Sequence, residues 1–308
     1  MRKRNIIICV IILAVVILGV LFFFLSMREL DGFRYNDDGT VELGEGYVSY
    51  GFHDKNRKVY DNASVILVDD GMVEGEYVFS QNMPQECRYG LIVMKDFRQT
   101  VFLASGESTM MYEFSLVGDA KKQIPMSIVV DDTCHEIEML IVTEPDAGTS
   151  EMINKDGSYN WDNMFASKSV YVQRFFVNES IPSIEEAIPA SPLQCDYLVG
   201  FDLVDCEEEM PTVFAKKTGG ETARIIYGQD VMDTDYVSVV AFCNWKQVPL
   251  SNESDVLLLK IPRGLNGYYD IHLPECESGD VYQLFAFPEP NEFGAVNRAS
   301  FRVILGKE

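Results

Sequence analysis

The apolar residues of the chain form one long run at its start and many shorter runs after it. The first run, 6–25, is 20 residues long and carries no charge. A helix rises about 1.5 Å per residue, so this run spans roughly 30 Å, the thickness of the hydrocarbon core of a bilayer. The pattern predicts a transmembrane anchor over 6–25.

The orientation of this anchor follows from the charges before it. Arg2, Lys3 and Arg4 precede the run, and basic residues favour the cytoplasmic side of a membrane. We therefore expect residues 1–5 in the cytoplasm and 26–308 outside. A cleaved signal peptide is the alternative, but its apolar core is usually about 7–15 residues and ends at a small-x-small site, which Ser26-Met27-Arg28 does not provide.

The shorter apolar runs have the character of β-strands. They are rich in β-branched and aromatic residues and are separated by Gly, Pro, Asn and Asp. The clearest runs are 91–94, 137–142, 237–242, 256–261 and 281–287. Beyond the anchor no helical period is evident, so the sequence predicts an all-β ectodomain.

Two stretches of the chain match each other in order. Residues 77–102 align without a gap with 225–250 at an offset of 148, so Gln81 matches Gln229 and Gln99 matches Gln247. Residues 135–146 match 280–291 at an offset of 145, and 169–172 resembles 300–303. The order of these matches favours a duplication. We expect two tandem immunoglobulin-like β-sandwich units; because the Cys and Trp signature of antibody domains is missing, the prediction concerns architecture only.

The predicted organisation has six parts. The cytoplasmic tail and the anchor are followed by a stalk, a first β-domain, a proline-rich linker without basic residues and a second β-domain; the last four cover 26–40, 41–178, 179–194 and 195–308. Prolines stiffen a linker and do not support strand pairing. Between Pro145 and Ser169 the first unit has about 14 residues more than the second. We expect this insertion to be a loop, where functional residues often lie.

The insertion contains a candidate metal site. Oxygen-bearing side chains alternate along it, and Ca²⁺ takes six to eight oxygen ligands. The candidate ligands are Asn154, Asp156, Ser158, Asn160 and Asp162. An EF-hand loop would need glycine where Tyr159 stands, so an ordinary polar hairpin is the favoured interpretation and a calcium site the alternative.

Three aromatic residues are candidates for ligand binding. Phe97 and Trp245 occupy matching positions, each followed by a basic residue and glutamine, and such groups can stack on a sugar or anchor a partner. An inward aromatic on a strand gives the same pattern. Because both units carry it, we favour packing. Trp161, in the insertion, is the third candidate.

Six cysteines follow the anchor and permit three disulfides. They are Cys87, Cys134, Cys195, Cys206, Cys243 and Cys276. Pairings within the predicted units would be Cys87–Cys134, Cys195–Cys206 and Cys243–Cys276. Each requires Cα atoms within about 7 Å of each other.

Net charge and the absence of common motifs narrow the function. The formal charge of −23 disfavours binding to nucleic acids or anionic headgroups and favours a soluble exoplasmic domain. The chain has no Gly-x-Ser-x-Gly, His-Glu-x-x-His, phosphate loop or Cys-x-x-Cys zinc motif. Acid pairs at 69–70 and 131–132 could serve a glycoside hydrolase, but turns explain them better.

The sequence thus favours a membrane-anchored, extracellular and non-catalytic protein that binds, adheres or supports the envelope, similar in style to proteins of the bacterial cell surface. An accessory or sensory subunit of a membrane complex is an alternative, and an envelope-acting hydrolase a weaker one. We expect no cofactor apart from the calcium alternative. The expected partners are the membrane, through 6–25, and an envelope protein or glycan.

Overall fold

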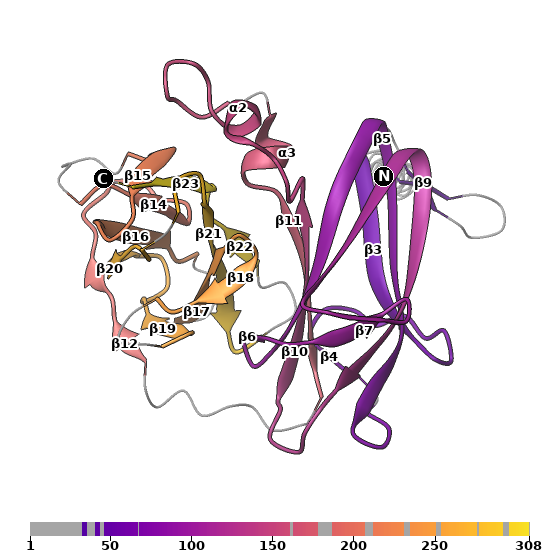
Figure 1. Ribbon diagram of the computed structural model, residues 1–308. Helices are drawn as coiled ribbons and strands as arrows, with labels where there is room; N and C mark the ends of the chain where they lie inside the picture. Colours follow the sequence, from indigo (N-terminus) through magenta and orange to yellow (C-terminus); the bar gives the residue numbers. More distant parts are fainter. Residues whose placement is uncertain are drawn as a thin grey trace, which may run out of the picture. The chain divides into compact units, whose positions relative to one another are not determined.

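The computed structural model describes residues 33–35, 41–43, 46–66, 68–160, 163–177, 187–206, 212–230, 235–250, 254–275, 277–291 and 296–307. Strands make up most of these residues, which confirms the all-β prediction (Figure 1). The predicted anchor at 6–25 lies outside the described residues. Among the residues that are described, no helix has the length and apolar character needed to cross a membrane.

The chain forms two compact units. The smaller comprises 1–50, 79–86 and 116–122, and the larger 51–78, 87–115 and 123–308. In the smaller unit β1 (Phe33–Tyr35) and β2 (Val41–Leu43) form an antiparallel pair, and β1 falls within the predicted stalk. The Gln81 Nε2 also donates to the Gly118 carbonyl there at 3.2 Å. The larger unit contains most of both predicted β-domains, called here the first and second halves.

The first half is built on one nine-stranded sheet with the order β4-β11-β10-β5-β9-β7-β8, in which β3 and β6 also pair with β5. Its strands are β3 (Tyr47–Asp54), β4 (Ser64–Val65), β5 (Met72–Lys95), β6 (Arg98–Gln99), β7 (Phe102–Ala104), β8 (Glu107–Thr109), β9 (Met111–Val129), β10 (Glu136–Thr143) and β11 (Val170–Phe176). The 24-residue β5 pairs with β10 along its C-terminal part. Strand β4 pairs with β11 in the parallel direction.

The second half is a sandwich of two sheets. The four-stranded sheet contains β13 (Ser191–Pro192), β20 (Asn266–His272), β16 (Thr222–Gly228) and β14 (Asp202–Val204) in that order. The eight-stranded sheet has the order β12 (Ile188–Pro189), β19 (Leu257–Lys260), β17 (Tyr236–Cys243), β21 (Val281–Glu289), β23 (Val303–Gly306) and β15 (Lys216–Thr218), with β18 (Lys246–Val248) on β17 and β22 (Arg298–Ala299) on β21. Alternate residues of the two sheets, such as Val237, Val239 and Ile225, form the core between them.

The central strands are buried on both faces. In β17, Val237, Val239 and Ala241 face the core of the second half, while Val240 and Phe242 join a second cluster with residues of β5 and β10. Every residue of β10 is buried. Double-sided burial explains why these strands appear in the sequence as continuous apolar runs rather than alternating ones. All five predicted runs overlap strands.

Matching segments occupy matching strands in the two halves. The β5–β6 hairpin corresponds to β17–β18, and β10 corresponds to β21. Strand β15 pairs in parallel with β23, as β4 does with β11. The segments that match in sequence at offsets of 148 and 145 therefore also have matching strand pairings.

The two hairpins also share an unusual turn. Asp96 and Phe97 have φ of 47° and 63°, and Asn244 and Trp245 have φ of 46° and 63°. Two central residues with positive φ make a type I′ turn, in which Asn and Asp are well tolerated and a large aromatic residue is strained. The same strain at matching positions indicates that the rings are held there by packing.

The structure differs from the predicted organisation in two places. Two single-turn helices, α2 (Thr149–Met152) and α3 (Met164–Ser167), lie in the insertion, and four residues are too few to show a helical period.

The linker was predicted over 179–194; residues 178–186 lie outside the described part, but β12 and β13 belong to the sheets of the second half. Proline is tolerated there because both strands are at sheet edges.

Candidate functional site

The two halves meet through a buried apolar surface, called here the joint. Each buried residue of the first half in it has a counterpart in the second at an offset of 148 or 145. The counterparts are Ile92 and Val240, Met94 and Phe242, Phe97 and Trp245, Leu140 and Phe285, and Val142 and Phe287. The joint thus resembles the isologous interface of a symmetric dimer, in which the same patch is used twice.

Two matched glutamines cross the joint reciprocally. The Gln99 backbone N–H donates to Gln247 Oε1 at 2.6 Å, and the Gln247 N–H donates to Gln99 Oε1 at 2.9 Å. The Gln99 Nε2 donates to the Trp245 carbonyl at 2.8 Å, and the Gln247 Nε2 donates to the Phe97 carbonyl at 2.7 Å. Each of the four contacts has a counterpart in which the two halves are exchanged, as a local two-fold rotation axis would produce.

Two buried arginines repeat the same reciprocity. The Arg174 guanidinium lies 5.3 Å from the Phe97 ring centroid and donates to the Pro288 carbonyl of the other half at 2.7 Å. The Arg302 guanidinium lies 4.7 Å from the Trp245 ring and donates to the Thr143 carbonyl of the other half at 2.5 Å. Thr143 and Pro288 are themselves matched at an offset of 145.

The charges around the two arginines break this symmetry. Arg174 is bound by Glu136, at 2.6 Å from Nε and 3.0 Å from Nη2, and its Nη2 also donates to Glu289. Burial raises the pKa of Glu289 to about 8 although Arg174 opposes the rise. Arg302 instead contacts the neutral Gln283 Oε1 at 3.2 Å and backbone carbonyls.

The insertion attaches the first half to the second. The Tyr159 hydroxyl donates to the Phe214 carbonyl at 2.7 Å, and Lys168 Nζ lies 2.8 Å from Asp202 Oδ2. Met152, Ile153 and other apolar residues of the insertion share a buried cluster with the second half. Sequence reasoning expected a functional loop and missed this docking, although apolar residues within a polar stretch were its visible signal.

The candidate calcium ligands form a closed polar hairpin where they are described. Asn154 Nδ2 donates to Ser158 Oγ at 3.2 Å and to the Tyr159 carbonyl at 2.9 Å. Asp156 Oδ1 accepts from the Ser158 N–H and hydroxyl. Within the described ranges no group of three or more His, Cys, Asp or Glu side chains is placed to hold a metal. Asp162 and the aromatic candidate Trp161 lie outside those ranges.

The other two aromatic candidates are buried. Phe97 is 9% exposed and Trp245 7% exposed. Trp245 Nε1 donates to the Pro145 carbonyl at 2.8 Å, and the Phe97 ring packs on Phe287 with centroids 5.4 Å apart. In this structure both rings pack within the joint and are not presented to a ligand.

The structure describes five of the six cysteines and bears on the expected pairing of Cys87 with Cys134. Cys87, Cys134, Cys195, Cys206 and Cys243 are thiols in the structure, and Cys276 lies outside the described residues. Cys87 and Cys134 lie near opposite ends of the β5–β10 pair, about eight residues or roughly 26 Å apart along the strand. Cys195 follows β13 and Cys206 follows β14, at opposite edges of the four-stranded sheet. The strand register therefore separates Cys87 and Cys134 by more than the ~7 Å that a disulfide allows.

Turns explain the two described acid pairs. Asp69 bridges Met72 across a turn, and Asp131 Oδ1 accepts the Thr133 N–H at 3.0 Å.

Cys134, next to His135, is buried, and burial raises the pKa of its thiol to about 12. A thiol with a raised pKa is a poor nucleophile.

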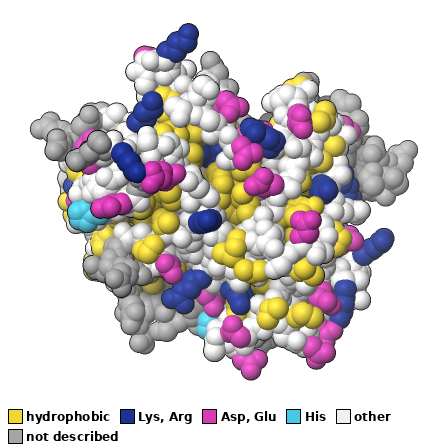
Figure 2. All heavy atoms as spheres, viewed as in Figure 1, with side chains coloured by type: hydrophobic (Ala, Val, Ile, Leu, Met, Phe, Trp, Pro, Cys, Tyr) yellow, Lys and Arg dark blue, Asp and Glu magenta, His cyan; other side chains and the backbone are white. Residues whose placement is uncertain are grey.

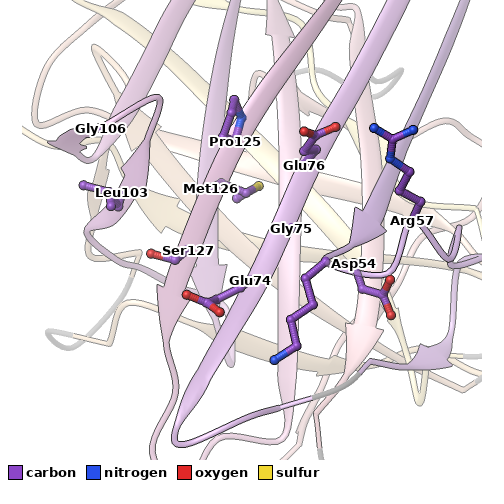
Figure 3. Close-up of a pocket in the computed structure, with 11 residues that line it drawn as sticks. Asp54, Arg57, Glu74, Gly75, Glu76, Leu103, Gly106, Pro125, Met126 and Ser127 are labelled. Atoms are coloured by element: carbon purple, nitrogen blue, oxygen red, sulfur yellow. The ribbon is translucent and has the colours of Figure 1, made fainter.

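A groove lies on the first half, and Figure 3 shows the side chains that line it. It has a volume of about 520 Å³ and is lined from β3, β5, β7, β9 and the turns after β3 and β7. Its lining residues are Asp54, Lys55, Arg57, Glu74, Gly75, Glu76, Leu103, Gly106, Pro125, Met126 and Ser127. On the face of the molecule drawn in Figure 2, acidic, basic and apolar side chains are interspersed.

Part of the groove's charge is already used within the protein. Lys55 pairs with Asp69, and Asp54 Oδ1 accepts the Asn56 and Lys58 N–H groups at 2.8 and 2.9 Å. Arg57, Glu74 and Glu76 also line the groove, and the charge of Glu74 acts on Lys55. Glu74 and Glu76 are two residues apart on β5, so they share one face about 7 Å apart. This spacing matches the side chains on one face of an extended peptide.

Comparisons with known proteins give distant structural similarity only. No protein-family model matches the chain, and no characterised protein matches its sequence. Red sea bream transglutaminase is similar at a TM-score of 0.21 and 8% identity over 85% of this chain and 31% of that one. The SafA pilin in complex with the SafB chaperone from Salmonella enterica is similar at 0.27 and 10% over 85% of this chain and 100% of that one. The BSP domain of a biofilm-associated protein is similar at 0.19 and 13%, over 80% and 29%. This chain therefore spans about a third of the transglutaminase, and the scores place it in none of these families.

Proposed function

We propose that this chain is a membrane-anchored, extracellular and non-catalytic protein whose two immunoglobulin-like halves form one rigid body for binding or supporting a component of the cell envelope. The reciprocal joint carries the proposal. It ties together the aromatic, amide and guanidinium groups that would otherwise be the best candidates for ligand contact. A body so fixed would hold a surface such as the groove at a constant orientation.

Membrane anchorage rests on 6–25 and the basic cluster before it. We expect protease added to intact, wall-stripped cells to remove a C-terminal epitope of the full chain, because residues 26–308 would lie outside. Immunoblotting with permeabilised cells as the control gives the measurement. Full protection of the epitope in intact cells would contradict this topology.

Binding through the groove is tested with a triple variant of the full chain, Arg57→Gln, Glu74→Gln and Glu76→Gln. Contacts by exposed charges contribute about 0.5–1 kcal/mol each, so we expect roughly tenfold or greater loss of binding. The measurement is a pull-down from envelope glycans and envelope proteins.

The matched control is Arg98→Gln, Glu86→Gln and Glu113→Gln, which makes the same charge change at exposed positions away from the groove. Equal binding by both variants would exclude the groove as the binding surface. Capture of membrane-complex subunits in place of glycans or surface proteins would favour the accessory-subunit alternative.

A further inference from the structure

Three buried carboxyl groups surround one arginine in the joint. Glu136, Glu138 and Glu289 are 1%, 0% and 6% exposed, and Arg174 is fully buried. With every group ionised this cluster would carry two uncompensated negative charges. Buried charges without partners are costly, so such a cluster favours binding a proton.

Glu138 is the carboxyl group with the fewest partners. Its Oε2 accepts the Phe97 N–H at 3.2 Å, while its Oε1 is buried without a hydrogen-bond partner in the described structure. Arg174 directs its donors to Glu136, Glu289 and the Pro288 carbonyl instead. Among the described residues, the Phe97 N–H is the one donor to Glu138, and no cation forms a hydrogen bond with this carboxyl group.

The second half provides an internal comparison. Gln283 stands at the position matched to Glu138, and its Oε1 lies 3.2 Å from Arg302 Nε while its Nε2 donates to the Ser300 carbonyl at 2.8 Å. Glutamine has nearly the shape of a protonated glutamic acid. The same place in the joint is thus filled by a neutral group in one half and by a carboxyl group in the other.

The charges that face Glu138 from the surrounding strands are mostly negative. Glu136 lies on the same strand and Asp96 on the β5–β6 turn, against the positive charge of Arg174 on β11, which Glu289 of β21 also contacts. Asp96 is fixed there because its Oδ1 accepts the His135 and Glu136 N–H groups at 2.9 Å each.

We propose that Glu138 is a neutral carboxylic acid while the halves are docked, and that its ionisation loosens the joint, which makes the joint a proton-controlled latch between the halves. When the joint opens, the proton leaves to solvent and the carboxylate becomes hydrated. Ionisation in place would add a buried negative charge beside Glu136.

The direction of the pH dependence follows from the same surroundings. Burial, followed by the charge of Glu136, raises the pKa of Glu138 well above its ordinary value. The docked form therefore binds a proton that the separated form releases above its ordinary pKa of about 4.3. Docking is strongest at low pH and weakens as the pH rises towards the raised pKa.

The test uses the fluorescence of Trp245 in the full chain in detergent. The chain has two tryptophans, so Trp161→Phe leaves Trp245 as the single reporter within the joint. From about pH 6 to about pH 9, below the ordinary tyrosine pKa of about 10, we expect a red shift of emission and stronger acrylamide quenching. Glu138→Gln should clearly reduce both changes, since the amide stays neutral and only Glu136 and Glu289 of the cluster still titrate.

Glu113→Gln, at an exposed position, is the control for the loss of one negative charge and should titrate like the parent. The far-ultraviolet circular dichroism of each variant at pH 6 checks that it is folded. A parent protein without a pH-dependent shift would overturn the proposal, and so would a Glu138→Gln variant whose shift and quenching change as much as the parent's over the same pH range. A folded Glu138→Gln variant with exposed Trp245 at pH 6 would show that the charged form is needed for docking, which also overturns it.

Discussion

We expect Arg174→Met to lower the free energy of unfolding of the full chain by about 3–5 kcal/mol at pH 8, because breaking a buried ion pair leaves the partner charges buried without a counter-charge. Glu136 and Glu289 would lose their common cation, and the Pro288 carbonyl would lose its donor. Methionine keeps much of the apolar stem, so the loss reports mainly on charge and hydrogen bonding. Urea unfolding followed by circular dichroism gives the measurement.

The loss should be smaller at pH 5 than at pH 8. Burial already raises the pKa of both carboxyl groups, and without Arg174 they can be accommodated only in the protonated form, which costs less near their ordinary pKa. Lys55→Met removes an exposed ion pair with Asp69 and should leave the unfolding midpoint nearly unchanged. A loss for Arg174→Met no larger than that of Lys55→Met, or one independent of pH, would contradict the structure of the joint.

The strands and their duplication could be predicted because both leave local signals. Apolar runs rich in β-branched residues mark β10, β17 and β21, and the gap-free match identifies β5–β6 with β17–β18. The sequence could not show that the matched faces pack against each other. An apolar run such as 237–242 has the same sequence pattern in either case: its second face can pack against its own half or against the other half.

Long-range partners explain most of what sequence reasoning missed. Arg174 and Glu289 are 115 residues apart, and nothing near either residue indicates the other. The insertion was interpreted from its polar residues, whereas Met152, Ile153 and Tyr159 determine where it docks. The Cys87–Cys134 pairing followed unit boundaries, but the register of β5 and β10 separates these two residues along the strands.

The hairpin turns show how far local reasoning reaches. Asp96-Phe97 and Asn244-Trp245 contain no glycine, so the usual signature of a type I′ turn is absent. The match between Asp96 and Asn244 was nevertheless visible in the sequence. Its reason is structural, since both side chains accept N–H groups at the start of the matched strand, from Glu136 in one half and Val281 in the other.

Trp245→Ala should destabilise the full chain by about 3–5 kcal/mol, the usual cost of truncating a large buried aromatic side chain. The ring fills the joint beside Phe242 and Phe285, donates to the Pro145 carbonyl and lies under the Arg302 guanidinium. Its removal leaves a cavity and weakens contacts made by both halves.

Trp245→Phe separates packing from hydrogen bonding. It retains most of the ring and loses the 2.8 Å bond to the Pro145 carbonyl, so we expect a loss of about 1–3 kcal/mol from the unsatisfied carbonyl. Phe97→Ala, at the matched position, should cost about as much as Trp245→Ala if the joint uses both rings alike. Both alanine variants are measured by urea unfolding. A ring that served as an exposed ligand platform would change stability by less than about 0.5 kcal/mol on truncation, and that result would contradict packing within the joint.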